Sequence, residues 1–354
     1  MKRISKTTRS NFLTYGLVIV CYVVLQIMRA GGAVSSTLAG QLVPICAYVV
    51  MALSLNLTVG VLGELSLGHA GFMSVGAFTG TAAAILLADV IPFAPLRLAV
   101  AMVIGSIFAA IAGVIIGIPV LRLRGDYLAI VTLAFGEIIK GLVNNLFIGV
   151  DSEGLHAGLL NGPQLAEGGK MVIDGPMGIS GISKISTFTA GFILILITLF
   201  IVFNLVNSRS GRAIMALRDN RIAAESVGIN VTKYKMMAFV TSAALAGAAG
   251  VLFAMNFSTI VANKFDFNTS ILILVFVVLG GLGNMWGSII AAALLTVLPE
   301  MLRTFSNYRM LVYAIVLILV MLATNNPVLK EFFQRIGRKL RGKSARTEKG
   351  DAAE

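Results

Sequence analysis

Charged side chains within an apolar run are the first candidates for chemistry in this sequence. Glu137 and Lys140 stand three residues apart, near enough to pair on a helix, in the apolar run from Tyr127 to Phe147. At about 100° per residue, they share an arc of about 140° with Thr132, Gly136 and Asn144. Because buried charge is costly, the stripe faces either a water-filled path for a polar solute or a neighbouring helix that it locks by an ion pair.

Two histidines complete the set of side chains that titrate near neutral pH. His69 lies in the glycine-rich stretch 60–78, and His156 lies in a later polar segment. Two imidazoles alone do not build a metal site, and Cys21 and Cys46 stand in apolar runs without metal-ligand spacing. We expect no metal centre. We interpret His69 as a hydrogen-bonded structural residue, with a proton carrier as the alternative.

Motifs for enzymatic chemistry are missing from the sequence. It contains no G-x-x-x-x-G-K-[ST] phosphate loop, no G-x-S-x-G and no Ser/His/Asp arrangement. We therefore expect no catalytic residue, no cofactor bound by this chain, and no ATP hydrolysis by it unaided.

The composition places these residues in a membrane. Of the 354 residues 57% are hydrophobic and 12% are charged, and the mean hydropathy is +0.92. The apolar residues form blocks of about twenty, the length of a helix that crosses the hydrocarbon layer. The net charge of +12 does not predict nucleic-acid binding, because the basic residues collect at the ends of apolar blocks.

The blocks predict an all-α fold, a polytopic transmembrane helical bundle of about ten spans. Residues 1–324 form the transmembrane domain, and the basic amphipathic tail 325–354 is expected to lie on anionic lipid. The start resembles a signal peptide, but no A-x-A site precedes Arg29, so we expect an uncleaved first span. The predicted spans are 12–28, 41–60, 64–88, 96–120, 127–147, 187–206, 236–257, 269–283, 286–302 and 309–324.

The basic residues indicate the orientation of the chain. Of the 28 lysines and arginines, four lie in residues 1–10, two in 122–124, six in 207–235 and eight in 325–354. With the N-terminus inside, the ten-span arrangement puts all four segments on the cytoplasmic side, which positive residues prefer. Both termini are then cytoplasmic, and the polar segment 148–186 is external.

Two glycine-rich stretches interrupt apolar segments, one in each half of the chain. They read GVLGELSLGHAGFMSVGAF at 60–78 and GGLGNMWGSIIAAA at 280–293. Breaks at corresponding places of two pseudo-repeat halves are typical of a transporter's pathway, and glycines that only let helices pack closely are the alternative. The pathway candidates are Ser66, Gly68, His69, Gly71, Thr132, Glu137, Lys140, Asn144, Gly281, Gly283 and Asn284.

The polar segment 207–235 is too long for a plain turn between two spans. Strong helix formers fill residues 213–227, and Gly228 is a natural stop. We expect a short amphipathic cytoplasmic helix that sits in a groove on a soluble protein, with the lipid surface as the alternative. Its apolar side consists of Ile214, Leu217, Ile222 and Val227.

Three stretches of the chain resemble one family. They are IPVLRLRGDYLAIVTLAFGEI at 118–138, SGRAIMALRDNRIAAESVGI at 210–229 and VVLGGLGNMWGSIIAAALL at 277–295. They are similar to permease subunits of branched-chain amino acid importers of the ATP-binding cassette class, M-type subunit, and the likeness covers residues 41–324. The resemblance implies an inner-membrane subunit that translocates branched-chain or related amino acids and is coupled to a separate ATPase.

The resemblance also implies partners and a place where one of them docks. The partners are a second homologous permease subunit, two cytoplasmic ATPase subunits that bind ATP and Mg²⁺, and an external substrate-binding protein. The family's docking loop has alanines and a glycine at fixed spacing, which the segment 207–235 carries. The residues implied for coupling to the ATPase are Arg212, Arg218, Ala223, Ala224, Glu225 and Gly228.

Two departures from the family's pattern concern the substrate. The family's external TGGPNGI-like stretch reads DGPMGISGI at 174–182, and its Arg-Pro-Gln-Gly near the last span is replaced by ATNNPVL at 323–329. Permeases for urea, amides or other amino acids are the alternatives within the family. The alternative outside it is an ion-driven secondary transporter with Glu137, Lys140 and His69 as a relay, which needs no ATPase dock.

Overall fold

The computed structural model describes residues 6–32, 35–123, 125–151, 154–165 and 169–302, together with Leu311, Ala314, Ile315 and Ile318. The chain divides into two compact units, Met1–Val297 and Leu298–Glu354, and the fold described below is that of the first. The predicted tail 325–354 and most of the predicted span 309–324 lie outside the described residues.

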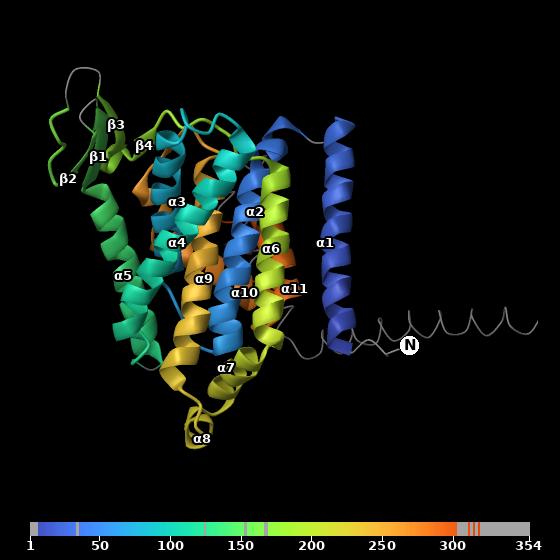
Figure 1. Cartoon of the computed structure of the whole chain (residues 1–354). Coiled ribbons are helices and arrows are strands. Elements are labelled where there is room, and N and C mark those ends of the chain that lie inside the picture. The colour runs from blue at the N-terminus through green and yellow to red at the C-terminus, as the bar shows by residue number, and fades with distance from the viewer. Residues whose placement is uncertain are drawn as a thin grey trace, which may run out of the picture. The chain divides into compact units, whose positions relative to one another are not determined.

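Helices make up most of the described chain (Figure 1). They are α1 (Lys6–Ala30), α2 (Ser36–Asn56), α3 (His69–Leu86), α4 (Ala94–Val120), α5 (Asp126–Asn144), α6 (Phe188–Asn207), α7 (Arg209–Asp219), α8 (Arg221–Ser226), α9 (Val231–Ala254), α10 (Phe267–Gly280) and α11 (Met285–Met301). A π-helix, η1 (Leu57–Leu62), continues α2, and two 3-10 helices are η2 (Gly175–Met177) and η3 (Ala262–Phe265).

Within the part of the chain that the structure describes, six helical segments are long and apolar enough to cross a membrane. They are Leu38–Leu62, His69–Leu86, Ala94–Val120, Phe188–Asn207, Val231–Ala254 and Ala262–Gly280, and shorter apolar helices cover Thr14–Ala30 and Met285–Met301. The predicted polytopic helical membrane protein is thereby confirmed. One predicted boundary is wrong: the span placed at 64–88 begins only at His69, because residues 63–68 form irregular chain around Gly63 and Gly68.

A small sheet departs from the predicted all-α fold. Antiparallel strands β1 (Leu146–Asp151), β2 (Gly154–Leu159) and β3 (Lys170–Asp174) lie in the order β2-β1-β3, and β4 (Ile179–Ser180) pairs with β5 (Thr259–Ile260). In the register, Ile148 lies opposite both Ala157 and Ile173. Strand β1 follows α5 directly and contains Phe147, Ile148 and Val150, aromatic and β-branched residues that favour strands. Such short apolar runs are hard to distinguish in sequence from the end of a span, and the prediction of 127–147 as one span overran β1.

Helix α9 forms the core of the unit. Its second half is almost entirely buried, and α2, α3 and α4 pack around it. A Cβ on Gly76 of α3 would overlap the backbone of Gly247 of α9, and a Cβ on Gly250 would overlap the Met73 carbonyl. Between lipid-embedded helices, where the hydrophobic effect gives little attraction, such close backbone approach supplies the packing that holds them together.

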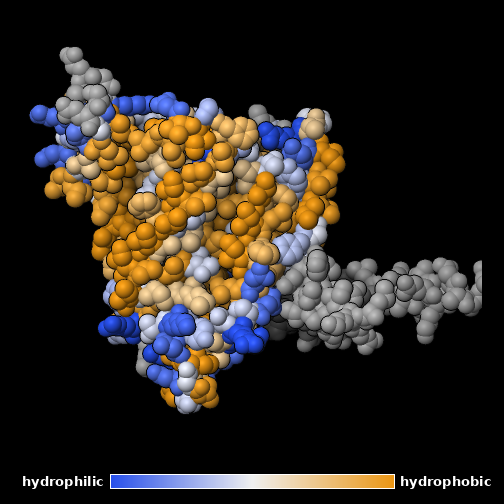
Figure 2. All heavy atoms as spheres, viewed as in Figure 1, coloured by the Kyte–Doolittle hydropathy of each residue, from blue (hydrophilic) through white to orange (hydrophobic). Residues whose placement is uncertain are grey.

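The outward faces of the surrounding helices are apolar. Ile107, Ile111 and Ile115 of α4 and Phe200 of α6 are all about half exposed or more. Figure 2 shows a broad apolar surface over these helices, with hydrophilic residues over the sheet at one end and over α7 and α8 at the other. An apolar surface of this extent is covered by lipid in a membrane protein.

Candidate functional site

Both glycine-rich stretches break the helices where the sequence predicts. After α2 the chain widens into η1, a kind of helical turn that is frequent at functional sites. It ends at Gly63 with φ +81°, a conformation that suits glycine, and α3 begins at His69. The second break follows Gly280, where Gly281 and Gly283 have φ values of +92° and +80° before α11 begins.

The two breaks lie far apart in the sequence but contact each other. Asn56, the last residue of α2, accepts a hydrogen bond on Oδ1 from the Gly283 N–H at 2.8 Å and donates from Nδ2 to Ser288 Oγ at 2.9 Å. A Cβ on Gly60 would overlap both Asn56 Oδ1 and the Gly283 nitrogen. Close packing therefore explains why glycine stands at position 60. The sequence analysis did not identify Asn56 or Ser288.

One arginine joins the segment 207–235 to this junction. Arg218, near the end of α7, donates from Nη1 to the Gly60 carbonyl oxygen at 2.8 Å. Its aliphatic part lies against Gly63, where a Cβ would stand 2.5 Å from Arg218 Cγ. The contact places Gly60, where the two breaks meet, at the end of the bundle that carries α7 and α8 (Figure 1).

A buried ion pair joins the first break to the start of α9. Lys235 pairs with Glu64, which follows η1 by two residues. Lys235 is only 3% exposed, so removing either partner would strand a charge away from water. The sequence analysis counted Lys235 only among the positive residues that orient the chain, and this second contact of 207–235 with the break was missed.

The predicted amphipathic helix over 213–227 is in fact two helices, α7 and α8. They meet at Asn220, whose extended backbone ends α7. Its side chain caps α8 by accepting a hydrogen bond from the Ala223 N–H at 3.0 Å. Asparagine is among the best helix N-caps, and this preference outweighs the helix propensity of the residues on either side.

The split also divides the predicted apolar side of this segment. Ile214 and Leu217 are buried, whereas Ile222 is 80% and Val227 is 74% exposed. Gly228 ends the segment with φ +85°. Among the coupling candidates Ala224 is buried, and the exposed ones are Arg212, Arg218, Ala223, Glu225 and Gly228. The tip of the segment thus presents apolar side chains beside charged ones.

His69 is buried at the start of α3 and contacts α2. Its Nε2 lies 2.8 Å from Ser54 Oγ. Because Ser54 donates its hydroxyl proton to the Met51 carbonyl at 2.9 Å, the ring nitrogen is the donor in the first contact. This arrangement fits a structural histidine better than a proton carrier.

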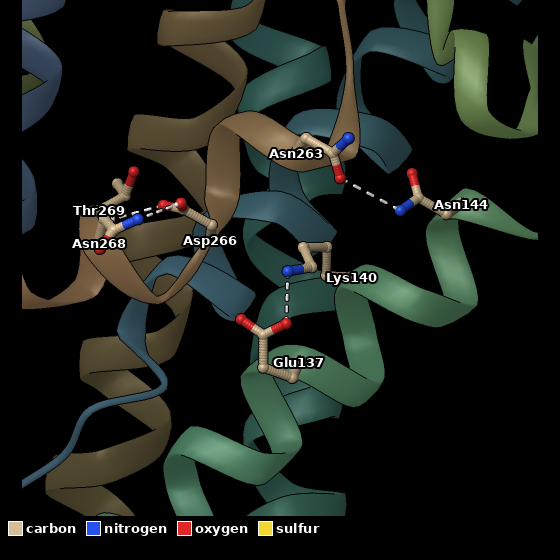
Figure 3. A network of polar contacts seen from close by, with 7 residues as sticks. All are labelled: Glu137, Lys140, Asn144, Asn263, Asp266, Asn268 and Thr269. Carbon is tan, nitrogen blue, oxygen red and sulfur yellow. Dashed lines mark hydrogen bonds and ion pairs between the residues drawn. The ribbon is translucent and has the colours of Figure 1, made fainter.

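Glu137 and Lys140 form the ion pair that their spacing predicts. Figure 3 shows both side chains on the side of α5 that faces the turn with Asn263 and Asp266. Asn144, one turn further along α5, donates to Asn263 Oδ1 at 3.4 Å. The side chains of the pair are 23% exposed at Lys140 and 40% exposed at Glu137, so a solute can reach them.

Asp266 belongs to this polar cluster and was missed in the sequence. It caps α10, accepting hydrogen bonds from the Thr269 N–H at 2.9 Å and from Asn268 Nδ2 at 2.8 Å. An aspartate placed just before an apolar helix is a local capping signal that could have identified it. A narrow cleft beside it does not admit a water molecule in this structure, and it is lined by Leu67, Gly71, Leu133, Gly136, Glu137, Phe265, Asp266, Phe267 and Ser270.

The irregular chain before α3 packs on the other part of α5. Thr132 Oγ1 accepts a hydrogen bond from the Leu67 N–H at 3.0 Å, and a Cβ on Gly68 would overlap the Thr132 carbonyl. Ser66 Oγ is buried without a hydrogen-bond partner among the described residues. Nine of the eleven pathway candidates fall into two groups: Gly68, Gly71, Thr132, Glu137, Lys140 and Asn144 around α5, and Gly281, Gly283 and Asn284 in the second break. Ser66 and His69 belong to neither group.

Comparison with known families bears on what this arrangement does. Residues 37–321 match the family described as the permease component of the branched-chain amino acid transport system. The chain belongs to this family. The resemblance inferred from the three motif stretches is confirmed, and the family consists of permease components of transport systems, not of enzymes.

Individual relatives of the permease family agree with this assignment. The chain is 36% identical over 286 residues to the high-affinity branched-chain amino acid transport system permease protein LivM of Salmonella typhimurium. It is 37% identical over 286 residues to LivM of Escherichia coli. Each match covers 78% of this chain and 66% of the relative. The ribose import permease protein RbsC of Haemophilus influenzae is 26% identical over 78% of this chain and 79% of its own length. No solved structure matches the chain.

In a permease, the two parts of the site offer different things. The cluster on α5 and the turn before α10 offers partly exposed charges and amides, which are groups that can bind a polar solute. The junction of the two breaks offers tightly packed backbone in direct contact with α7. Among the described residues, no group of three or more His, Cys, Asp or Glu side chains gathers to hold a metal ion.

Proposed function

We propose that this chain is the permease subunit of an ATP-binding cassette importer for branched-chain or related amino acids in the inner membrane. The observation that carries the proposal is the family match over residues 37–321, together with relatives named as LivM permeases. The permease supplies the path and no bond chemistry. ATP and Mg²⁺ are bound and hydrolysed in partner subunits.

The α7–α8 segment is the proposed dock for the ATPase. A soluble partner can cover its exposed Ile222 and Val227 and pair with the neighbouring charges, as a groove receives an amphipathic helix. The segment has basic residues at both of its ends, and it lies at the end of the bundle opposite the sheet (Figure 1). Both features support this role. The coupling residues are those that the family's loop implies, Arg212, Arg218, Ala223, Ala224, Glu225 and Gly228.

The remaining partners follow from the same proposal. A second homologous permease completes the pathway, two ATPase subunits drive it, and an external binding protein delivers the solute. We infer about ten spans in two pseudo-repeat halves with both termini cytoplasmic, which the distribution of lysine and arginine supports. The sheet β1–β3 then lies outside, where a binding protein arrives.

The polar cluster around α5 is the proposed lining of the pathway. Glu137, Lys140 and Asp266 carry charges of both signs, which suits a solute with an ammonium and a carboxylate group. Their partial exposure supports contact with a solute. Phe267, which is 38% exposed, adds apolar surface beside them for an aliphatic side chain.

Uptake by a Gly228→Trp variant tests the proposal. Gly228 has φ +85° and open space around it, so tryptophan strains the loop by about 1–2 kcal/mol without a clash in the core. The variant should reach the membrane in normal amount, and uptake of labelled leucine should fall to background. Gly32→Trp is the matched control, because Gly32 has φ +70° and equally open surroundings outside the family match, and its uptake should be normal. Normal uptake by the Gly228 variant would refute the dock.

A further inference from the structure

The junction at the α7 end of the bundle supports an inference beyond docking. Three stretches meet there: the end of α7, the π-helix η1 with Gly63, and the turn that contains Gly283. We propose that Arg218 is the positioning residue that transmits movement of the α7–α8 segment to both glycine breaks. This inference rests on the proposed function, because it needs an ATPase that moves the segment.

The link from Arg218 to the first break is short and stiff. A guanidinium bound to a carbonyl is a charge-assisted hydrogen bond, stronger than one between neutral groups. The aliphatic part of the same side chain rests on Gly63 with no room for a Cβ between them. Movement of α7 therefore displaces the backbone of η1, because close-packed groups transmit a displacement instead of absorbing it.

The link from the first break to the second is equally close. The Gly60 backbone packs against Gly283 so tightly that a Cβ does not fit. Asn56 binds the Gly283 N–H with one end of its amide and Ser288 of α11 with the other. A displacement of η1 thus reaches the start of α11 through a packed backbone contact and a buried amide.

The two cations that hold the first break differ in their surroundings. Lys235 is a buried residue of α9, the core helix, and it pairs with Glu64 of the first break. The side chain of Arg218 is 41% exposed, and its Nη2 contacts the exposed Asp219 at 3.3 Å. Lys235 therefore anchors the break to the core, while Arg218 connects it to the surface of the α7–α8 segment, where a partner acts.

Labelling of the second break gives a direct test in the complete transporter. Leu282 lies in that break and is 58% exposed, which makes it a suitable reporter position. We would place cysteine there after replacing Cys21 and Cys46, and measure its rate of reaction with N-ethylmaleimide in membrane vesicles with and without ATP and Mg²⁺. With Arg218 present, the rate should change with nucleotide. With Arg218→Gln, the change should disappear while the ATPase still co-purifies.

The coupling ratio distinguishes transmission from simple stability. Leucine imported per ATP hydrolysed should fall about tenfold or more in Arg218→Gln, the expected effect of losing one charge-assisted hydrogen bond. A destabilised protein would instead lose both activities in proportion. Arg218→Lys, which keeps a cationic donor, should recover part of the ratio. Arg209→Gln, an exposed arginine on the same helix, is the control and should leave the ratio unchanged.

Four outcomes would overturn the inference. Normal coupling in Arg218→Gln would mean that the contact with Gly60 is incidental. Loss of the co-purified ATPase in that variant would make Arg218 a docking residue. If the unmodified chain recovers no ATPase at all, the proposed function itself fails, and the inference falls with it. If Arg218→Gln does not reach the membrane, Arg218→Lys takes its place, and a normal coupling ratio in a variant whose labelling no longer responds to nucleotide would also contradict the inference, because the two should change together.

Discussion

At the scale of single residues, isolated polar groups in apolar helices make the contacts that define the site. Asn56 joins two breaks, Arg218 reaches the first of them, and Lys235 neutralises Glu64. Asn56 and Lys235 are buried, and each compensates for its removal from water through a specific partner, as buried polar groups must. Arg218 differs because its side chain is 41% exposed, and the pair of Glu137 and Lys140 is likewise partly exposed and open to a solute.

A charge swap on α5 tests whether that pair serves the solute or the fold. An ion pair this exposed contributes about 0–1 kcal/mol to stability, so Glu137→Gln should leave the thermal midpoint of the purified protein almost unchanged. Leucine uptake should nevertheless fall. The double variant Glu137→Lys, Lys140→Glu can still form an ion pair, but the positions of the positive and negative charges that face the solute are exchanged. Its uptake should therefore stay low. Recovery of uptake in the double variant would instead show that the ion pair only stabilises the packing of the helices.

Residues of the site differ in how well the sequence reveals them. Glu137 and Lys140 were predicted because they lie three residues apart on one helix. Arg218 and Gly60 are separated by 158 residues, Lys235 and Glu64 by 171, and Gly283 and Asn56 by 227. Contacts at such separations depend on the packing of several helices, which no local pattern encodes. Asp266 is intermediate, since its capping role is local but its place beside α5 is not.

At the scale of elements, glycine sets how closely the helices approach. Glycines on α3 and α9 bring these helices to backbone contact, and glycines in η1 and in the turn after α10 do the same for the two breaks. The sequence revealed the helices and the breaks through apolar length and glycine content. It did not reveal the division of α7 from α8 at Asn220 or the short strands after α5, because a single cap and runs of five or six residues are weak local signals.

Replacing one glycine between α3 and α9 should loosen the core. A Cβ in Gly76→Ala would overlap the Gly247 backbone, so the helices must separate, at a cost of about 1–3 kcal/mol. The thermal midpoint in detergent should fall accordingly. Gly40→Ala in α2 is the matched control, because nothing lies near its Cβ, and a helical alanine there should be neutral or slightly stabilising. Equal midpoints for both variants would contradict the packing described here.

At the scale of the whole molecule, the sheet and the α7–α8 segment occupy opposite ends of the first unit (Figure 1). The junction at Arg218 lies at the end that carries α7, and the polar cluster includes Asn144, the last residue of α5 before β1 of the sheet. This arrangement suits a permease that receives solute at one end and a driving partner at the other. Family membership and the segment with exposed Ile222 and Val227 distinguish this account from an ion-driven transporter, which needs no such dock.

The central claim is that this permease works with a separate ATPase held at α7 and α8. The most direct measurement is affinity purification of the tagged full chain from detergent-solubilised membranes, followed by identification of the proteins that come with it. An ATPase with a phosphate-binding loop should be recovered with the unmodified chain and with Gly32→Trp but lost with Gly228→Trp. A chain that purifies alone and still transports leucine in ion-loaded vesicles without ATP would contradict it.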